Sequence, residues 1–115
     1  DVIYFVQAMA PGHLIKIGYS DDKIKKIRGR LCALRNTCAV RIKVLALRNG
    51  SQDQEKELHS DFASYRQWGE WFLPSAPLLA FIAEVPAHPF LDFVQPTYEC
   101  DRVLWRGEIK ARIAP

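Results

Sequence analysis

Two short apolar stretches decide the fold of this chain: Ile15–Tyr19, which reads IKIGY, and Val2–Val6 before it, which reads VIYFV. Each is typical of a buried strand, and each holds one polar side chain near its middle, Lys16 and Tyr4 respectively. A hairpin that turns at Pro11-Gly12 sets Tyr4 opposite Lys16 on one face of the sheet. A phenol beside an ammonium fits a reactive centre. A core tyrosine beside a lysine that extends to solvent is the commoner arrangement.

The composition is that of an ordinary folded domain. With 115 residues, 49% hydrophobic and 25% charged, the chain can form one hydrophobic core and is not disordered. No apolar run approaches the roughly 20 residues that cross a membrane, so no membrane association is expected. The three cysteines, Cys32, Cys38 and Cys100, are odd in number and lack CxxC spacing, which predicts a reducing, cytoplasmic environment. A zinc site of Cys32, Cys38 and a histidine is a minor alternative.

Basic residues are concentrated in the first half of the chain, although the net charge is only +3. Residues 16–48 contain ten lysines and arginines against Asp21 and Asp22, whereas residues 84–115 contain four against five acidic residues. This asymmetry favours an anionic partner such as nucleic acid, and a solvated helix face is the alternative.

A first helix is predicted after the hairpin, with N-cap candidates in Ser20–Asp22. Its apolar stripe recurs at helical spacing and consists of Ile24, Ile27, Leu31 and Leu34. Gly29 in the middle predicts a late start or a bend. Arg28 and Arg30 flank the stripe on opposite sides, so either could reach the sheet. Residues 39–47, rich in Val, Ile and Leu, predict a third strand.

A second helix carries the most informative local pattern. Ser51 and Gln54 match a capping box at its start. One face of the helix then holds five residues: Glu55, Leu58, His59, Phe62 and Arg66. Because Leu58 and Phe62 must face the core, Glu55 and His59 point inward with them, whereas Glu57 points to solvent.

An inward carboxylate without a cation costs several kcal/mol. Glu55 is therefore expected to contact a metal ion, Lys16 or an arginine. A structural ion pair explains this carboxylate as well as a functional site does. Further along, Trp71 and Phe72 are expected to be core anchors, and Glu70 beside them is a weaker candidate for the same polar cluster.

The remaining segments are less specific. Residues 77–83 predict a closing helix packed on the sheet, and residues 85–89 predict a stiff turn in which His88 is a loop residue. Residues 103–113 predict one bent strand or a strand pair.

Five blocks, taken together and in this order, resemble the GIY-YIG nuclease superfamily. They are Tyr4, the triplet Lys16-Ile17-Gly18, Arg30-Leu31 with Leu34, Glu55 with Leu58-His59 and Phe62, and Gly69-Glu70-Trp71-Phe72. The chain is most similar to the phage-associated branch that includes the "meiotically up-regulated gene" type domain, in which the second motif often reads Lys-Ile-Gly. The resemblance covers residues 2–83.

The resemblance implies an α/β (α+β) fold, with a small mixed sheet of three antiparallel strands flanked by helices. It implies a nuclease domain at residues 1–83 and a C-terminal extension at residues 84–115 that packs on it or trails from it. It also implies a phage or bacterial endonuclease that hydrolyses nucleic acid, with DNA as the expected substrate and Mg²⁺ (or Mn²⁺) as the cofactor.

By the same resemblance, Tyr4 activates or positions the attacking water, and Glu55 binds the single metal ion. Lys16 stands where the second motif usually has tyrosine, and could lower the pKa of Tyr4 or hold the water. Arg30, or failing that Arg28, contacts the scissile phosphate. The glycine of the first motif is absent, because this segment reads Val2-Ile3-Tyr4.

His59 and Glu70 belong to branch motifs; His59 is counted among the catalytic candidates because it lies one helical turn from Glu55. The basic segment is expected to hold backbone phosphates through Lys23, Lys25, Lys26, Arg28 and Arg35. One alternative is a non-catalytic nucleic-acid-binding module fused within a larger phage or bacterial protein. Another is a protein–protein adaptor that acts through the C-terminal tail.

Overall fold

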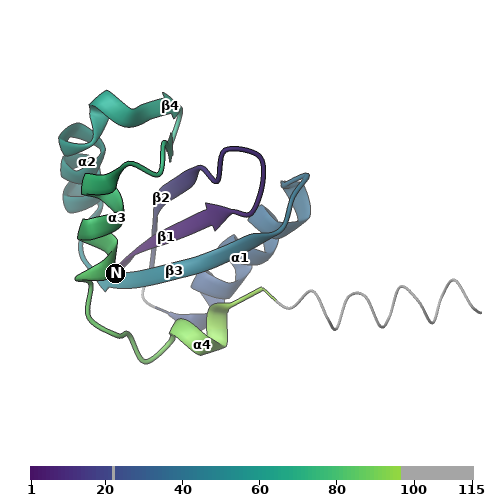
Figure 1. Ribbon diagram of the computed structural model, residues 1–115. Helices are drawn as coiled ribbons and strands as arrows, with labels where there is room; N and C mark the ends of the chain where they lie inside the picture. The colour runs from purple at the N-terminus through teal and green to yellow at the C-terminus, as the bar shows by residue number, and fades with distance from the viewer. Residues whose placement is uncertain (22, 97–115) are drawn as a thin grey trace, which may run out of the picture.

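The computed structural model describes residues 1–21 and 23–96 (Figure 1). In chain order its elements are β1 (Val2–Ala8), β2 (Ile15–Ser20), α1 (Ile24–Thr37), β3 (Ile42–Asn49), α2 (Gln52–Asp61), the 3₁₀ turn η1 (Ala63–Tyr65), β4 (Arg66–Trp68), β5 (Trp71–Phe72), α3 (Ala76–Ala83) and α4 (Leu91–Val94). The strand prediction for residues 103–113 and the residue Cys100 fall outside the described residues.

The strands form one sheet in the order β3-β1-β2-β5-β4, and all neighbouring strands are antiparallel. The mixed α+β class is confirmed. The expected sheet of three strands is incomplete, because β4 and β5 extend it at the β2 edge. These two strands have only three and two residues, which is too short for the sequence to show alternating side chains.

The register of the β1–β2 hairpin differs by two residues from the expected one. Tyr4 pairs with Gly18 and Lys16 pairs with Val6, so Tyr4 and Lys16 are diagonal neighbours. The cause is a wide loop over residues 9–14, in which two successive residues, 12 and 13, have positive φ and Ala8 N donates to Leu14 O over 2.9 Å. A shift of two residues preserves the face of each side chain, so Tyr4 and Lys16 still share one face.

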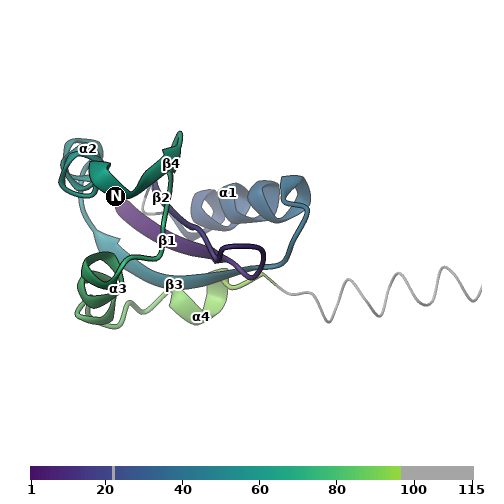
Figure 2. The same ribbon diagram turned by 45° about the horizontal axis from the view of Figure 1, so that its top comes forward.

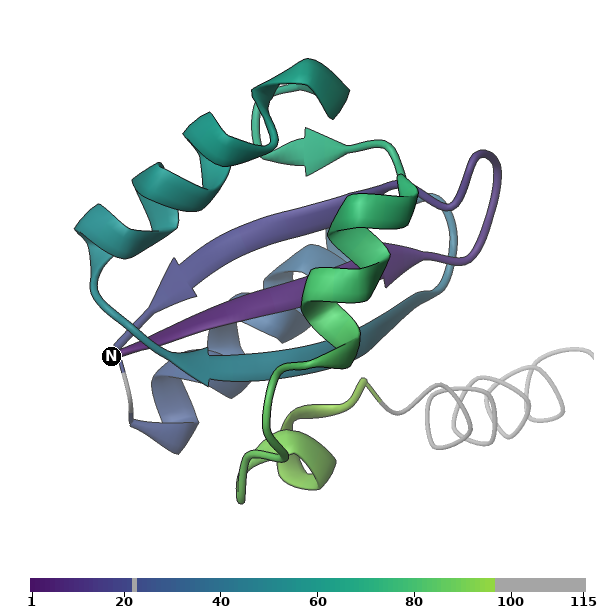
Figure 3. The same cartoon turned by 60° about the vertical axis from the view of Figure 1, so that its left-hand side comes forward.

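Both faces of the sheet are covered by helices. Val2, Tyr4 and Val6 of β1 join a core cluster with α1 and α4, whereas Ile3 and Phe5 join a second cluster with α2 and α3. Figure 2 and Figure 3 show α1 and α3 on opposite sides of the strands. This burial on both faces explains why β1 is apolar along nearly its whole length.

The start of α1 differs from the expected one. Its N-cap is Lys23, whose side chain makes no capping hydrogen bond, and Ser20 is instead the last residue of β2. Asp21 Oδ1 accepts a hydrogen bond from Lys23 N (3.2 Å) just before the helix. The helix is continuous through Gly29, so the expected late start is not observed.

The start of α2 confirms the capping box. Ser51 Oγ accepts a hydrogen bond from Gln54 N (3.2 Å), and Gln54 Oε1 accepts one from Ser51 N (2.8 Å). The helix ends at Asp61, and Arg66 lies in β4. The expectation that Arg66 shares the helix face with Glu55 is therefore wrong, because the chain leaves the α-helix at Phe62 and enters a 3₁₀ turn.

Replacing Ser51 by alanine is expected to lower the free energy of unfolding by about 1 kcal/mol, since the backbone N–H of Gln54 at the start of α2 loses its acceptor, Ser51 Oγ. Urea denaturation followed by circular dichroism measures this change. Ser60→Ala, at an exposed position of the same helix, is the control and should change the stability by less than about 0.5 kcal/mol. Equal effects of the two substitutions would contradict the capping role.

The segment after β5 forms two further helices. α3 confirms the closing helix, and residues 85–89 contain neither helix nor strand, as expected. The sequence did not predict α4, which packs against α1 and β3 with Val94 buried. The side chain of Gln95 bonds the outer edge of β3, because its amide donates to Val44 O (2.7 Å) and accepts from Val44 N (3.0 Å).

Cys32 is exposed and Cys38 is half-buried, and both are free thiols. Within the described residues, the cluster able to hold a metal ion contains neither cysteine, so the zinc alternative lacks support. Every helix in this part of the chain is too short or too polar to cross a bilayer.

Candidate functional site

The candidate site lies where α2 and the β4–β5 turn meet the edge of β2. β5 pairs with β2 only at Ile15 and Lys16. At the next residue, Ile17 N donates to Glu70 O (3.0 Å), and Ile17 O lies 2.9 Å from His59 Nε2. A carbonyl oxygen only accepts, so His59 Nε2 is the donor and carries the proton. The backbone of Ile17 thus forms hydrogen bonds with both α2 and the β4–β5 turn, so both are attached to β2 at this residue.

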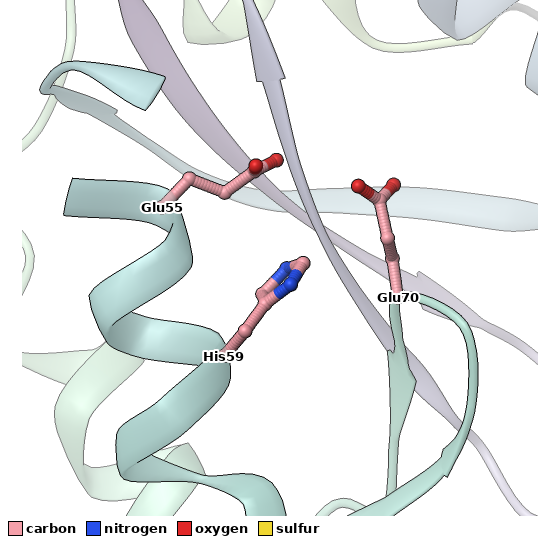
Figure 4. Close-up of side chains that lie close together, drawn as sticks. All are labelled: Glu55, His59 and Glu70. Carbon is pink, nitrogen blue, oxygen red and sulfur yellow. The ribbon is translucent and has the colours of Figure 1, made fainter. Parts of the chain in front are cut away.

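Three side chains converge at this point. Figure 4 shows Glu55 and His59 projecting from α2 toward Glu70, which lies in the turn just before β5. One ligand atom from each residue lies within 4.8 Å of those of the other two. Two carboxylates and an imidazole at this spacing match the donor set of a divalent metal ion. The inward orientation expected for Glu55 and His59, and the clustering expected for Glu70, are both present.

Glu55 is the most unusual member of the cluster. The residue is only 5% exposed, and its carboxylate has no hydrogen bond or ion pair within the described residues. Burial raises the pKa of the Glu55 carboxyl, and the charge of Glu70 raises it further, while His59, Lys16 and Lys56 act in the opposite direction. Within residues 1–21 and 23–96, Glu55 is therefore not the structural ion-pair partner of Lys16 or of an arginine.

Lys16 pairs with Glu70 instead. Its Nζ lies 2.9 Å from Glu70 Oε1 and 5.9 Å from the centre of the Trp71 ring. Trp71 is half-buried, whereas Phe72 is fully buried, so only Phe72 behaves as a core anchor. The ammonium is thus held at the β5 side of the site by a carboxylate and an aromatic ring.

Tyr4 covers Gly18. A Cβ atom at Gly18 would overlap Cζ, Cε1 and Oη of Tyr4, so the phenol occupies the space that a side chain would fill. Burial raises the pKa of Tyr4 to about 12, Glu70 and Glu55 raise it as well, and Arg30 lowers it. Tyr4 is therefore a neutral phenol at pH 7, and the suggestion that Lys16 lowers its pKa is not supported. Within the described residues, its hydroxyl has no hydrogen-bond partner.

Of the two α1 arginines, Arg30 is the one whose charge acts on Tyr4. Both arginines are exposed, as are Lys23, Lys25 and Lys26. Arg35 is half-buried, with its Nε donating to Asn36 Oδ1 over 3.4 Å. The exposed basic residues lie in or next to α1, which places them on the Tyr4 face of the sheet.

Two features of the site were missed from the sequence. Gly18 belongs to the Lys16-Ile17-Gly18 motif, but a glycine inside an apolar strand also signals a close approach by another group. Ser20, an N-cap candidate in the sequence, is the second. It is fully buried two residues beyond Gly18, and its Oγ has no hydrogen-bond partner in the part of the chain that the structure describes.

Comparisons of the chain with protein-family models, with curated proteins and with solved structures each found no match.

Proposed function

We propose that this chain is a divalent-metal-dependent endonuclease that hydrolyses phosphodiester bonds of nucleic acid, with DNA as the expected substrate. One observation carries the proposal: Glu55, a carboxylate that is 5% exposed, lies beside a second carboxylate, an imidazole and the phenol of Tyr4, and neither Glu55 nor the Tyr4 hydroxyl has a partner among the described residues. Folding alone gains nothing from such an arrangement, because a buried charge without a partner is destabilising.

The donor set fits a divalent cation. Glu55 would hold the ion, and His59 and Glu70 lie within reach of the same position. A bound cation would supply positive charge for the phosphate and for the leaving oxygen. Mg²⁺ accepts one or two carboxylates and keeps its remaining ligands as water, so a small protein cage is sufficient.

The other residues suit the remaining tasks of hydrolysis. Tyr4, as a neutral phenol, can hydrogen-bond the attacking water or a phosphate oxygen. The charge of Arg30, on α1, acts on Tyr4, and Arg30 is therefore the proposed phosphate clamp, in preference to Arg28. Lys16, which is paired with Glu70, adds a positive charge for the phosphate on the side of the site next to β5. The exposed lysines of the α1 segment would contact backbone phosphates on either side of the scissile bond.

A non-catalytic nucleic-acid-binding module is the second candidate. It is favoured by the exposed basic surface of α1, which could bind phosphates without any contribution from Glu55. Such a module predicts salt-sensitive DNA binding but no cleavage.

A plasmid-nicking assay tests the proposal, with Mg²⁺, with Mn²⁺ and with EDTA. Tyr4→Phe is expected to lower the metal-dependent cleavage rate at least about 10²-fold, because the hydroxyl that contacts the water or phosphate is lost. Stability should change by less than about 1 kcal/mol, since the aromatic ring stays and the hydroxyl has no hydrogen bond to another described residue that would be lost.

The matched control is Tyr19→Phe. Tyr19 lies on the opposite face of β2, where its hydroxyl donates to Asp1 Oδ2 (2.8 Å), so this substitution should leave cleavage unchanged. Salt-sensitive DNA binding with no cleavage under either metal would replace the nuclease by the binding module. No binding at low salt would exclude both, and would favour an adaptor.

A further inference from the structure

The cluster at the β2 edge offers more ligands than the single carboxylate that the resemblance assigns to the metal. Mg²⁺ seldom takes a nitrogen ligand, whereas imidazole suits transition metals. We propose that Glu55, His59 and Glu70 together bind one divalent transition-metal ion in the absence of nucleic acid, and that the ion displaces Lys16 from Glu70. The use of this ion for cleavage rests on the proposed function, but its binding does not.

The geometry of the three side chains supports a single ion. Their ligand atoms lie within 4.8 Å of one another, and Figure 4 shows them directed at a common space between α2 and β5. Proximity of acidic groups would not suffice by itself. The independent observation is that Glu55 is 5% exposed, has no partner among the described residues, and is aimed at this space. A cation there would neutralise the two carboxylates at once.

His59 is arranged as a metal ligand would be. Its Nε2 donates to Ile17 O over 2.9 Å, which leaves Nδ1 of the neutral ring with a lone pair. A backbone carbonyl that fixes the tautomer is the usual second partner of a metal-bound histidine. The ring is also packed on Phe72, with centroids 5.3 Å apart, so its orientation is already set before an ion binds.

In this structure, the positive charge that pairs with the Glu70 carboxylate comes from Lys16. Its ammonium lies 2.9 Å from Glu70 Oε1, and the two side chains are 19% and 40% exposed. An ion that coordinates Glu70 must compete with this ammonium and is also repelled by it. Exposed ion pairs are weak, so a divalent ion with three ligands should win this competition. Lys16 would then be free to turn to the phosphate.

The test measures Mn²⁺ binding to the full chain without nucleic acid, from the free Mn²⁺ signal in electron paramagnetic resonance, with Mg²⁺ and Co²⁺ as competitors. We expect one ion per chain, with Co²⁺ displacing Mn²⁺ more effectively than Mg²⁺ does, which is the order expected of a transition-metal site. His59→Gln and Glu70→Gln should each weaken Mn²⁺ binding at least about tenfold. Lys16→Met should strengthen it about three- to tenfold, because the competing charge is removed.

Glu57→Gln is the matched control, an exposed glutamate on the same helix, and should bind Mn²⁺ as the unchanged chain does. Thermal unfolding followed by circular dichroism confirms that each variant is folded. Unchanged Mn²⁺ affinity in folded His59→Gln and Glu70→Gln would overturn the three-ligand site, and unchanged affinity in Lys16→Met would overturn the displacement. The Mn²⁺ titration measures binding alone, so it can be compared with the nicking assay of the same proteins. Mn²⁺ binding without nicking would retain this inference and reject the nuclease. Nicking by His59→Gln and Glu70→Gln variants with unchanged Mn²⁺ affinity would retain the nuclease and reject the three-ligand site.

Discussion

Gly18→Ala is expected to lower the free energy of unfolding by about 1–3 kcal/mol and to abolish cleavage. A Cβ at this position overlaps three atoms of the Tyr4 side chain, two in the ring and the hydroxyl oxygen. Tyr4 is only 5% exposed and packs in the cluster of α1 and α4, so the ring cannot move aside without disturbing that core. The single added methyl group therefore affects stability and the site together.

Gly29→Ala is the control for this substitution. Gly29 lies within α1, where an added Cβ meets nothing within 4 Å. Alanine there should raise the free energy of unfolding by about 0.5–1 kcal/mol through helix propensity, without any effect on cleavage. Urea denaturation and plasmid nicking of both variants provide the comparison. A stable, active Gly18→Ala protein would show that Tyr4 does not need its position over β2.

Glu55→Gln is expected to lower metal-dependent cleavage about 10³-fold or more while leaving the fold intact or more stable. The sign of the stability change follows from the pKa of Glu55. Burial and Glu70 raise this pKa in the folded chain, so ionisation above the unfolded-state pKa opposes folding. A neutral glutamine of the same shape removes that cost, and the unfolding temperature at pH 7 should stay the same or rise. Loss of activity without loss of stability distinguishes a functional carboxylate from a structural one.

Glu57→Gln again serves as the control, because it removes a charge from the exposed side of the same helix. Its cleavage rate should equal that of the unchanged chain. Cleavage retained in Glu55→Gln would reject the metal assignment. A fall of several degrees in its unfolding temperature would instead identify Glu55 as part of a structural charge network.

Local patterns in the sequence were sufficient for most of the secondary structure. The apolar runs of β1 and β2, the stripe of α1 and the capping box of α2 depend on neighbours in the chain, and each formed as predicted. The inward direction of Glu55 and His59 was predictable for the same reason. A helix that buries Leu58 must carry both residues on the same side.

Which side chains of the site contact one another was decided only by the tertiary structure. The loop over residues 9–14 moved the hairpin register by two residues and placed Tyr4 over Gly18. The short strands β4 and β5 brought Glu70 to Lys16, which left Glu55 without a partner in the part of the chain that the structure describes. Loop geometry and contacts between distant segments depend on the packing of the whole chain, whereas helix and strand periodicity is local. The sequence by itself therefore determined the elements and the inward-facing acid, and the packing determined its neighbours.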